Sequence, residues 1–215
     1  MAGVIALKSR YHEKFGRFHI KKSMLPIKQA LRKNILMLRG QLSPDARTAY
    51  SAAISQRLLH LSEYRQAETV LGYMNFGAEF ASELWAGQVL AEGKRLVLPR
   101  VNHHTNRLDL YRVEDLENQL ATGLWGIREP IAERCERLGE LNEVEFVLLP
   151  GVAFARDGAR LGYGKGFYDR LLAQMTHRPA LVAAAFALQI VEQIPQEATD
   201  IKVEWIVTEQ ETIIC

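Results

Sequence analysis

The residues best suited to chemistry lie in one short run, Arg160–Asp169, which reads Arg-Leu-Gly-Tyr-Gly-Lys-Gly-Phe-Tyr-Asp. Alternate glycines at Gly162, Gly164 and Gly166 allow backbone N–H groups to approach an anion closely, while the arginine at the start and Lys165 add positive charge. The run precedes a predicted helix, whose N-terminus also attracts anions. This pattern predicts a loop that binds a polyphosphate.

Two familiar nucleotide-binding loops do not match this run. A Walker loop requires G-x-x-x-x-G-K followed by Ser or Thr, whereas Ala159 and Gly166 occupy the first and last of these places. A dinucleotide-binding loop requires G-x-G-x-x-G, and Phe167 stands where its third glycine belongs. Taken alone, the run is equally consistent with a glycine-rich turn whose lysine is merely solvated.

Two helices are predicted to open the domain. Pro26 suits a first helical turn, and apolar side chains from Leu31 to Leu38 recur at near-helical spacing among basic residues. Ser43 followed by Pro44 predicts the capped start of a second helix, which continues to about residue 61.

A strand–helix–strand unit follows these helices. We predict a buried strand at Thr69–Asn75, a helix at Ser82–Glu92 and a second strand at Arg95–Pro99. Such a crossover requires a parallel pair of strands covered by a helix.

The rest of the chain continues the alternation of strands and helices. We predict a strand at Leu108–Val113, surface connections at Leu124–Pro130 and Glu133–Glu143, a strand at Phe146–Pro150, a loop at Gly151–Gly158, a helix at Gly166–Met175, a strand at Ala180–Phe186, a short helix at Gln189–Gln193 and an edge strand at Trp205–Thr208. This order predicts a single α/β domain over residues 26–215, with a mixed, mainly parallel sheet flanked by helices.

The composition excludes several classes of protein. With 215 residues, 48% hydrophobic and 24% charged, the chain has the makeup of an ordinary globular domain. A formal net charge of +2 does not argue for a nucleic-acid or membrane partner, and no run approaches the roughly 20 apolar residues that span a bilayer. Cys135 and Cys215 lack metal-ligand spacing, which favours a reducing compartment, so we expect a cytoplasmic protein. We also expect a monomer.

Residues 1–25 form a basic segment with two interpretations. Residues 1–22 contain six lysines and arginines and a single acidic residue, Glu13, a composition that is typical of a targeting peptide. However, the apolar stretch Val4–Leu7 is much shorter than a secretory core. We therefore expect a solvated, partly disordered extension.

The glycine run and its surroundings resemble the signature of the 5-formyltetrahydrofolate cyclo-ligase family, also called methenyltetrahydrofolate synthetases. The matching segments are Phe146–Gly151, Arg160–Arg170, Lys28–Arg32, Tyr73–Glu79, Leu98–Arg100 and Trp125–Ile127, within roughly residues 27–210. The resemblance implies ATP-dependent cyclisation of 5-formyltetrahydrofolate to 5,10-methenyltetrahydrofolate, with release of ADP and phosphate through a phosphorylated formyl (imidate) intermediate and with Mg²⁺ as cofactor.

The resemblance also implies which residues contact ATP: Lys28, Arg32, Arg160, Leu161, Gly162, Tyr163, Gly164, Lys165, Gly166, Phe167 and Tyr168. Of these, Arg160 and Lys165 are the predicted catalytic residues. The spacing of four between Lys28 and Arg32 puts both on one helix face, where they can share an anion. Without the family context, the same face is an ordinary solvated one.

Two aspartates resemble the family's magnesium ligands, Asp169 after the glycine run and Asp200 near the C-terminus. Magnesium is held by few protein oxygens together with phosphate and water, so two carboxylates suffice. Each aspartate alone is more often an ordinary helix or loop charge. The sequence departs from the family pattern at Glu204, where aspartate is expected.

The folate substrate is expected to contact Met74, Glu79, Arg100, Trp125 and Phe167. The resemblance implies that Met74 packs on the pterin and that the Glu79 carboxylate accepts two N–H groups from its edge. Without that context, Glu79 is a loop or helix-start carboxylate. We expect the folate segment, Arg100 and the glycine run to meet at the strand ends, where ligands bind in such sheets.

Two other functions remain open at this point. A sugar-phosphate isomerase on a similar sheet would need an anion-binding loop but no nucleotide. An RNA-binding module would use the basic extension and the Lys28–Arg39 helix face, and its binding would depend steeply on salt.

Overall fold

The computed structural model describes residues 24–215, so the basic segment of residues 1–22 lies outside the described part. Within that part, a helix runs over residues 24–40, slightly longer at its start than Pro26 predicts. The second helix, α2 (Pro44–His60), begins with the predicted cap, because the Ser43 hydroxyl accepts a hydrogen bond from the Ala46 N–H at 3.2 Å.

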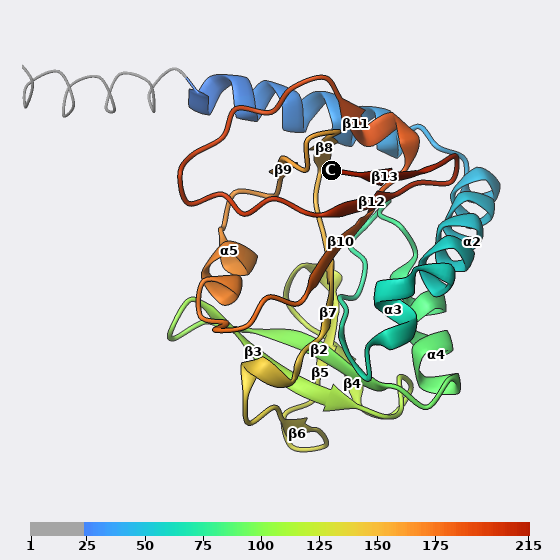
Figure 1. Cartoon of the computed structure of the whole chain (residues 1–215), viewed down its shortest axis with the longest axis vertical. Coiled ribbons are helices and arrows are strands. Elements are labelled where there is room, and N and C mark those ends of the chain that lie inside the picture. The colour runs from blue at the N-terminus through green and yellow to red at the C-terminus, as the bar shows by residue number, and fades with distance from the viewer. Residues whose placement is uncertain (1–23) are drawn as a thin grey trace, which may run out of the picture.

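An eight-stranded sheet forms the centre of the molecule (Figure 1). Its strands in spatial order are β13 (Thr212–Ile214), β12 (Trp205–Val207), β10 (Ala180–Ala184), β7 (Phe146–Leu149), β1 (Thr69–Leu71), β2 (Arg95–Asn102), β3 (Arg107–Val113) and β6 (Glu136–Arg137). The strands from β12 to β2 are parallel, and antiparallel strands complete both edges. The predicted mixed, mainly parallel α/β sheet is confirmed.

Helices cover both faces of this sheet. The helices are α2, α3 (Ser62–Gln66) and α4 (Ser82–Ala91) beside one face, and α5 (Phe167–Leu172) beside the other (Figure 1). Trp85 and Tyr64 are fully buried between the first group and the sheet, whereas Leu171 of α5 packs on the opposite face. Each face of the central strands is therefore apolar, as the continuous hydrophobic runs of parallel strands require.

A small second sheet extends from the end of β7. It contains β11 (Ile190–Val191), β8 (Ala153–Ala155) and β9 (Arg160–Leu161) in that order. The helix of residues 24–40 packs on this sheet through Ile35, which belongs to a cluster with Val152 and Leu161. This packing holds the N-terminal helix beside the glycine run.

A third element is the two-stranded ribbon of β4 (Leu120–Thr122) and β5 (Arg128–Pro130), closed by the 3₁₀ turn Leu124–Gly126. The other short 3₁₀ turns are Leu141–Glu143 and Ala187–Gln189. In the part of the chain that the structure describes, no helix has the length and apolar character needed to cross a membrane.

Several predicted elements are wrong in type. The expected loop at Gly151–Gly158 contains β8, and the surface connections contain β4, β5 and β6. The helix predicted at Gln189–Gln193 is a 3₁₀ turn that leads into β11. These strands have two or three residues each, too short for alternation of polar and apolar side chains to reveal them.

Candidate active site

Residues 162–166 of the glycine run connect β9 to α5. Two of its glycines have positive φ angles, +93° at Gly164 and +63° at Gly166, a conformation that other residues rarely adopt. Gly166 is the residue directly before α5. The loop thus changes direction twice before the helix, which requires glycine at both positions.

The N-terminal helix presents a row of residues to this loop. Lys28, Arg32, Ile35 and Arg39 recur at intervals of four, three and four, so they share one helix face. The Arg32 Nε donates to the Gly162 carbonyl at 2.8 Å, and the Arg39 Nη2 donates to the Tyr163 hydroxyl at 2.7 Å. The predicted phosphate-binding helix face therefore meets the predicted phosphate loop.

Two of the predicted phosphate-binding cations are paired with the two predicted metal ligands. The Lys28 Nζ lies 3.0 Å from Asp200 Oδ2 and 3.8 Å from Glu197 Oε1. The Arg160 Nη2 lies 2.7 Å from Asp169 Oδ1. The Ile201 N–H also donates to Asp169 Oδ1 at 3.3 Å, so the segment that carries Asp200 lies against Asp169.

The two aspartates suit a cation that is also held by phosphate. The Lys28 ammonium and the Glu197 N–H both bind Oδ2 of Asp200, while Arg160 and the Ile201 N–H both bind Oδ1 of Asp169. In the described residues, these bonds use one oxygen of each carboxylate and leave the other without a hydrogen bond. Within residues 24–215 no group of three or more His, Cys, Asp and Glu is arranged to hold a metal, so phosphate oxygens and water would complete the coordination.

Lys165 differs from these cations because its side chain is exposed. Its carbonyl oxygen accepts a hydrogen bond from the Arg170 Nη1 at 2.9 Å, and no ion pair to its ammonium is present in the described residues. The ammonium is thus available to an incoming anion.

The Glu79 carboxylate lies in contact with the glycine loop. Its Oε1 accepts a hydrogen bond from the Tyr163 hydroxyl at 2.5 Å, and its Oε2 accepts one from the Phe76 N–H at 2.7 Å. The Arg39 Nη1 lies 3.8 Å from Oε1. The structure therefore brings the predicted folate carboxylate and the predicted phosphate loop together.

Burial dominates the electrostatics of Glu79. The residue is 5% exposed, and this burial raises the pKa of its carboxyl group, while the Tyr163 hydroxyl, the Arg39 charge and the Phe76 N–H act in the opposite direction. Burial also raises the pKa of Tyr73, Tyr163 and Tyr168, and the negative charge of Glu79 adds to each increase. These phenols therefore stay protonated around the carboxylate.

The other predicted folate residues have unequal access. Met74 is 7% exposed and belongs to the core cluster, so little of its side chain is open to a ligand. Phe167 is half-buried, with the Arg170 guanidinium 5.3 Å from the centre of its ring. Phe76, which sequence reasoning did not select, is 39% exposed and packs edge-on against Tyr163.

Arg100 and Trp125 are the two predicted folate residues carried by β2 and by the ribbon of β4 and β5. Arg100 is on β2, which packs against β5 of the ribbon that carries Trp125. Trp125 is 54% exposed and has a φ of +62°, a strained backbone for an aromatic residue and one that often marks a functional loop. In the described part of the chain, no hydrogen bond or ion pair connects either residue to Glu79 or Lys165.

Comparisons with known proteins identify the family of this chain. The model of the 5-formyltetrahydrofolate cyclo-ligase family matches residues 25–209. The chain belongs to this family. The 5-formyltetrahydrofolate cyclo-ligase of Mus musculus is 28% identical over 192 residues, which are 85% of this chain and 93% of the mouse protein.

Two solved structures have the same fold. The NMR structure of the 5,10-methenyltetrahydrofolate synthetase of Aquifex aeolicus has a TM-score of 0.76 and 36% identity, and the match covers 87% of this chain and 92% of that one. The synthetase of Mycoplasma pneumoniae is 24% identical with a TM-score of 0.68, and the match covers 85% of this chain and 98% of that one. At this identity the similarity supports the fold alone.

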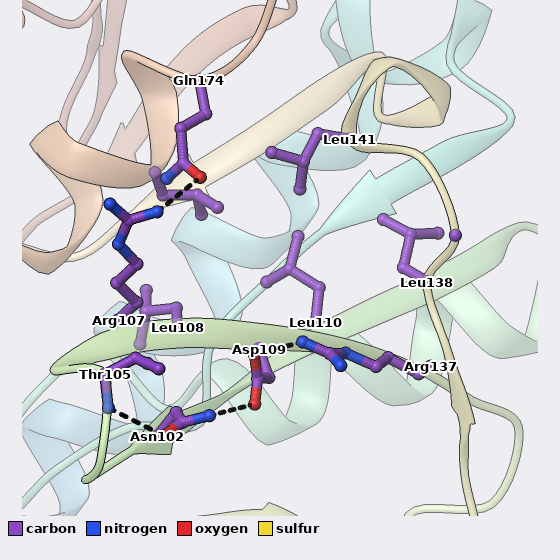
Figure 2. A pocket seen from close by; sticks show the side chains of 12 residues that line it. Asn102, Thr105, Arg107, Leu108, Asp109, Leu110, Arg137, Leu138, Leu141 and Gln174 are labelled. Atoms are coloured by element: carbon purple, nitrogen blue, oxygen red, sulfur yellow. Dashed lines mark hydrogen bonds and ion pairs between the residues drawn. The ribbon is translucent and has the colours of Figure 1, made fainter.

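A separate cavity of about 580 Å³ lies on the α5 side of β3 (Figure 2). Leucines form its apolar lining, and its polar rim is paired internally, because Asp109 accepts from Asn102 and Arg137 while Arg107 donates to Gln174. None of the predicted cyclo-ligase site residues lines it. This cavity is therefore distinct from the predicted site.

Sequence reasoning missed Arg39 and Glu197 in this region. Arg39 continues the row of Lys28 and Arg32 by the same helical spacing, so the signal was present in the sequence. Glu197 has no such signal, because the segment before Asp200, which contains Pro195, has no regular periodicity. Glu204, the departure from the family pattern, accepts from the Leu181 N–H and pairs with Arg178 at 3.1 Å.

Proposed function

We propose that this cyclo-ligase family member uses ATP to convert 5-formyltetrahydrofolate into 5,10-methenyltetrahydrofolate, with ADP and phosphate as the other products. The observation that carries the proposal is the contact between Glu79 and Tyr163, which joins the folate segment to the phosphate loop. A reaction between a folate and a nucleotide needs these two binding regions side by side.

On the phosphate side, we assign charge neutralisation to Lys28, Arg32, Arg160 and Lys165. Three of these cations are already held by protein oxygens, at Asp200, the Gly162 carbonyl and Asp169. Cations held in place before the substrate arrives stabilise developing charge without reorganisation. Backbone N–H groups of the glycine loop and the start of α5 would add donors for phosphate oxygens.

We assign Mg²⁺ to Asp169 and Asp200 together with ATP phosphates. Each aspartate has one oxygen engaged by a cation and a backbone N–H, and its other oxygen suits the metal. When bound, the ion would neutralise phosphate charge and help align the phosphoryl group.

On the folate side, we assign Glu79 to the donor edge of the pterin. A carboxylate has about four lone-pair sites, so Glu79 can keep its bonds to Tyr163 and Phe76 and still accept two N–H groups. Phe167, Trp125 and Met74 would pack against the ring, and Arg100 would lie toward the remainder of the folate.

The proposed chemistry has two steps. The formyl oxygen attacks the γ-phosphorus of ATP. The bond between this phosphorus and the leaving oxygen of ADP breaks, and an imidate phosphate forms. The neighbouring folate N–H nitrogen then attacks the formyl carbon and loses its proton, and phosphate leaves with the former formyl oxygen and takes up that proton, which gives the methenyl bridge. The protein's part is alignment of the two substrates and neutralisation of charge.

We further propose that the protein is a cytoplasmic monomer with no nucleic-acid or membrane partner. Both cysteines are free, as expected in a reducing compartment, and the net charge of +2 is small.

The proposal is tested with purified protein, 5-formyltetrahydrofolate, Mg²⁺ and ATP, by following the product through its near-ultraviolet absorbance. We expect product only when both ATP and Mg²⁺ are present, and a chelator should stop the reaction until Mg²⁺ is added in excess. Turnover of a sugar phosphate without ATP would favour the isomerase. Salt-dependent RNA binding without stabilisation by ATP would favour the RNA-binding module.

A further inference from the structure

Arg39 is a buried cation beside the carboxylate of Glu79, the residue assigned to folate binding. The residue is 3% exposed, its Nη2 donates to the Tyr163 hydroxyl at 2.7 Å, and its Nη1 lies 3.8 Å from Glu79 Oε1. A buried guanidinium is costly unless a charge or hydrogen-bond acceptors compensate it. Glu79 is the only carboxylate paired with it in the part of the chain that the structure describes.

The guanidinium also retains binding capacity. Its Nε and Nη1 are buried and have no hydrogen-bond partner among residues 24–215. Because native proteins rarely leave buried donors unsatisfied, these atoms mark a place where a small movement or a ligand completes the arrangement. A shift of less than 1 Å would bring Nη1 from its 3.8 Å separation into hydrogen-bond range of Glu79.

Tyr163 lies between the two charged groups. Its hydroxyl accepts from Arg39 and donates to Glu79 Oε1, so one oxygen atom links the N-terminal helix, the glycine loop and the folate segment. The Phe76 N–H holds the other carboxylate oxygen. Glu79 is thereby fixed from both sides before any ligand is present.

We propose that Arg39 is a positioning residue for folate binding, which holds the Glu79 carboxylate through Tyr163 and supplies the positive charge that balances it. The inference rests on the proposed role of Glu79. Arg32, about two turns earlier on the same face, binds the loop backbone instead, so the same helix serves the nucleotide with one end and the folate with the other.

The test compares Arg39→Gln, Arg39→Lys and Tyr163→Phe with the parent enzyme, with KM measured separately for each substrate. Arg39→Gln should raise the KM for 5-formyltetrahydrofolate by about tenfold or more, as expected for loss of a hydrogen bond from a charged group, and change the KM for ATP by less than about twofold. Arg39→Lys keeps the charge and should recover part of the loss. Tyr163→Phe, at a residue that is 42% exposed, should raise the folate KM in a protein that folds normally.

A double-mutant cycle separates positioning from a structural role. If Arg39 acts through Glu79, Arg39→Gln adds little to the folate KM in a Glu79→Gln background. Additive effects, an equal rise in both KM values, or no effect of Arg39→Gln when Glu79→Gln has one would overturn the inference and leave the proposed function intact. No effect of Glu79→Gln itself would instead overturn the folate role of Glu79. If Arg39→Gln does not fold, Arg39→Lys and Tyr163→Phe decide the result by the same cycle.

Discussion

Replacement of Lys165 by alanine tests whether the glycine loop takes part in phosphoryl transfer. The side chain is exposed and has no ion pair within residues 24–215, so its removal should change the free energy of unfolding by no more than about 0.5 kcal/mol. The turnover number kcat should fall by a much larger factor, because we assign the ammonium to the stabilisation of charge that develops on the transferring phosphoryl group.

The size of the loss of kcat in Lys165→Ala depends on how far water is excluded from the loop when the substrates bind. Two unit charges about 4 Å apart interact by about 1 kcal/mol in bulk water and by about 4 kcal/mol at an effective dielectric constant of about 20. With about 1.4 kcal/mol for each factor of ten in rate, Lys165→Ala would lower kcat about fivefold in an open loop and about 10³-fold in a desolvated one. We expect a loss of about 10²-fold, typical for removal of one preorganised donor.

The assay is the rate of methenyltetrahydrofolate formation at saturating ATP and folate, together with thermal unfolding of each variant. Lys33→Ala is the matched control, because Lys33 is an exposed lysine on the N-terminal helix outside the row of Lys28 and Arg32. An unchanged kcat in Lys165→Ala would refute the assigned role. A loss of only about fivefold would show that the loop stays open to water during the reaction.

Two further predictions concern stability. The buried Gln189 side chain accepts a hydrogen bond from the Phe186 N–H and donates to the Gly151 and Val152 carbonyls. Gln189→Ala should therefore lower the free energy of unfolding by about 3 kcal/mol in a denaturant titration. The control Gln193→Ala, at an exposed residue, should be nearly neutral, and equal effects of the two substitutions would contradict this reasoning. Burial raises the pKa of Glu79, so its contribution to stability is present below the usual pKa of 4.5 and is lost as pH rises through the folded-state pKa. The Tm of the parent should therefore fall relative to that of Glu79→Gln as pH rises through the folded-state pKa, and a Tm difference between the two that does not change with pH would contradict this assignment.

The sequence predicts the central fold well because the parallel strands and their helices are long enough to have a pattern. The crossover from Thr69 through α4 to β2 and the strand at Phe146 followed by the glycine loop all appear in the structure. The predicted strand ends are less accurate: β1 stops at Leu71, since the chain then turns into the folate segment, whereas β2 continues to Asn102 because β3 pairs along its whole length.

The candidate site was predictable where a motif or a helical period carried it. The alternate glycines and the spacing of Lys28 and Arg32 indicated an anion site, and the structure places them together. The pairing of Lys28 with Asp200 and the bond from Tyr163 to Glu79 join residues that are 172 and 84 positions apart. Such contacts depend on tertiary packing of the small sheet against the N-terminal helix, and a single sequence has no local signal for them.

Several charged groups of the proposed site are paired with one another in the described residues. Lys28 and Arg160 pair with Asp200 and Asp169, and Arg39 pairs with Glu79, so these charges have partners inside the protein. A metal would bind the second oxygens of the two aspartates, and a pterin would add donors to Glu79, so neither needs to displace these partners. We therefore expect the nucleotide side and the folate side of the proposed site to keep these contacts when their ligands bind.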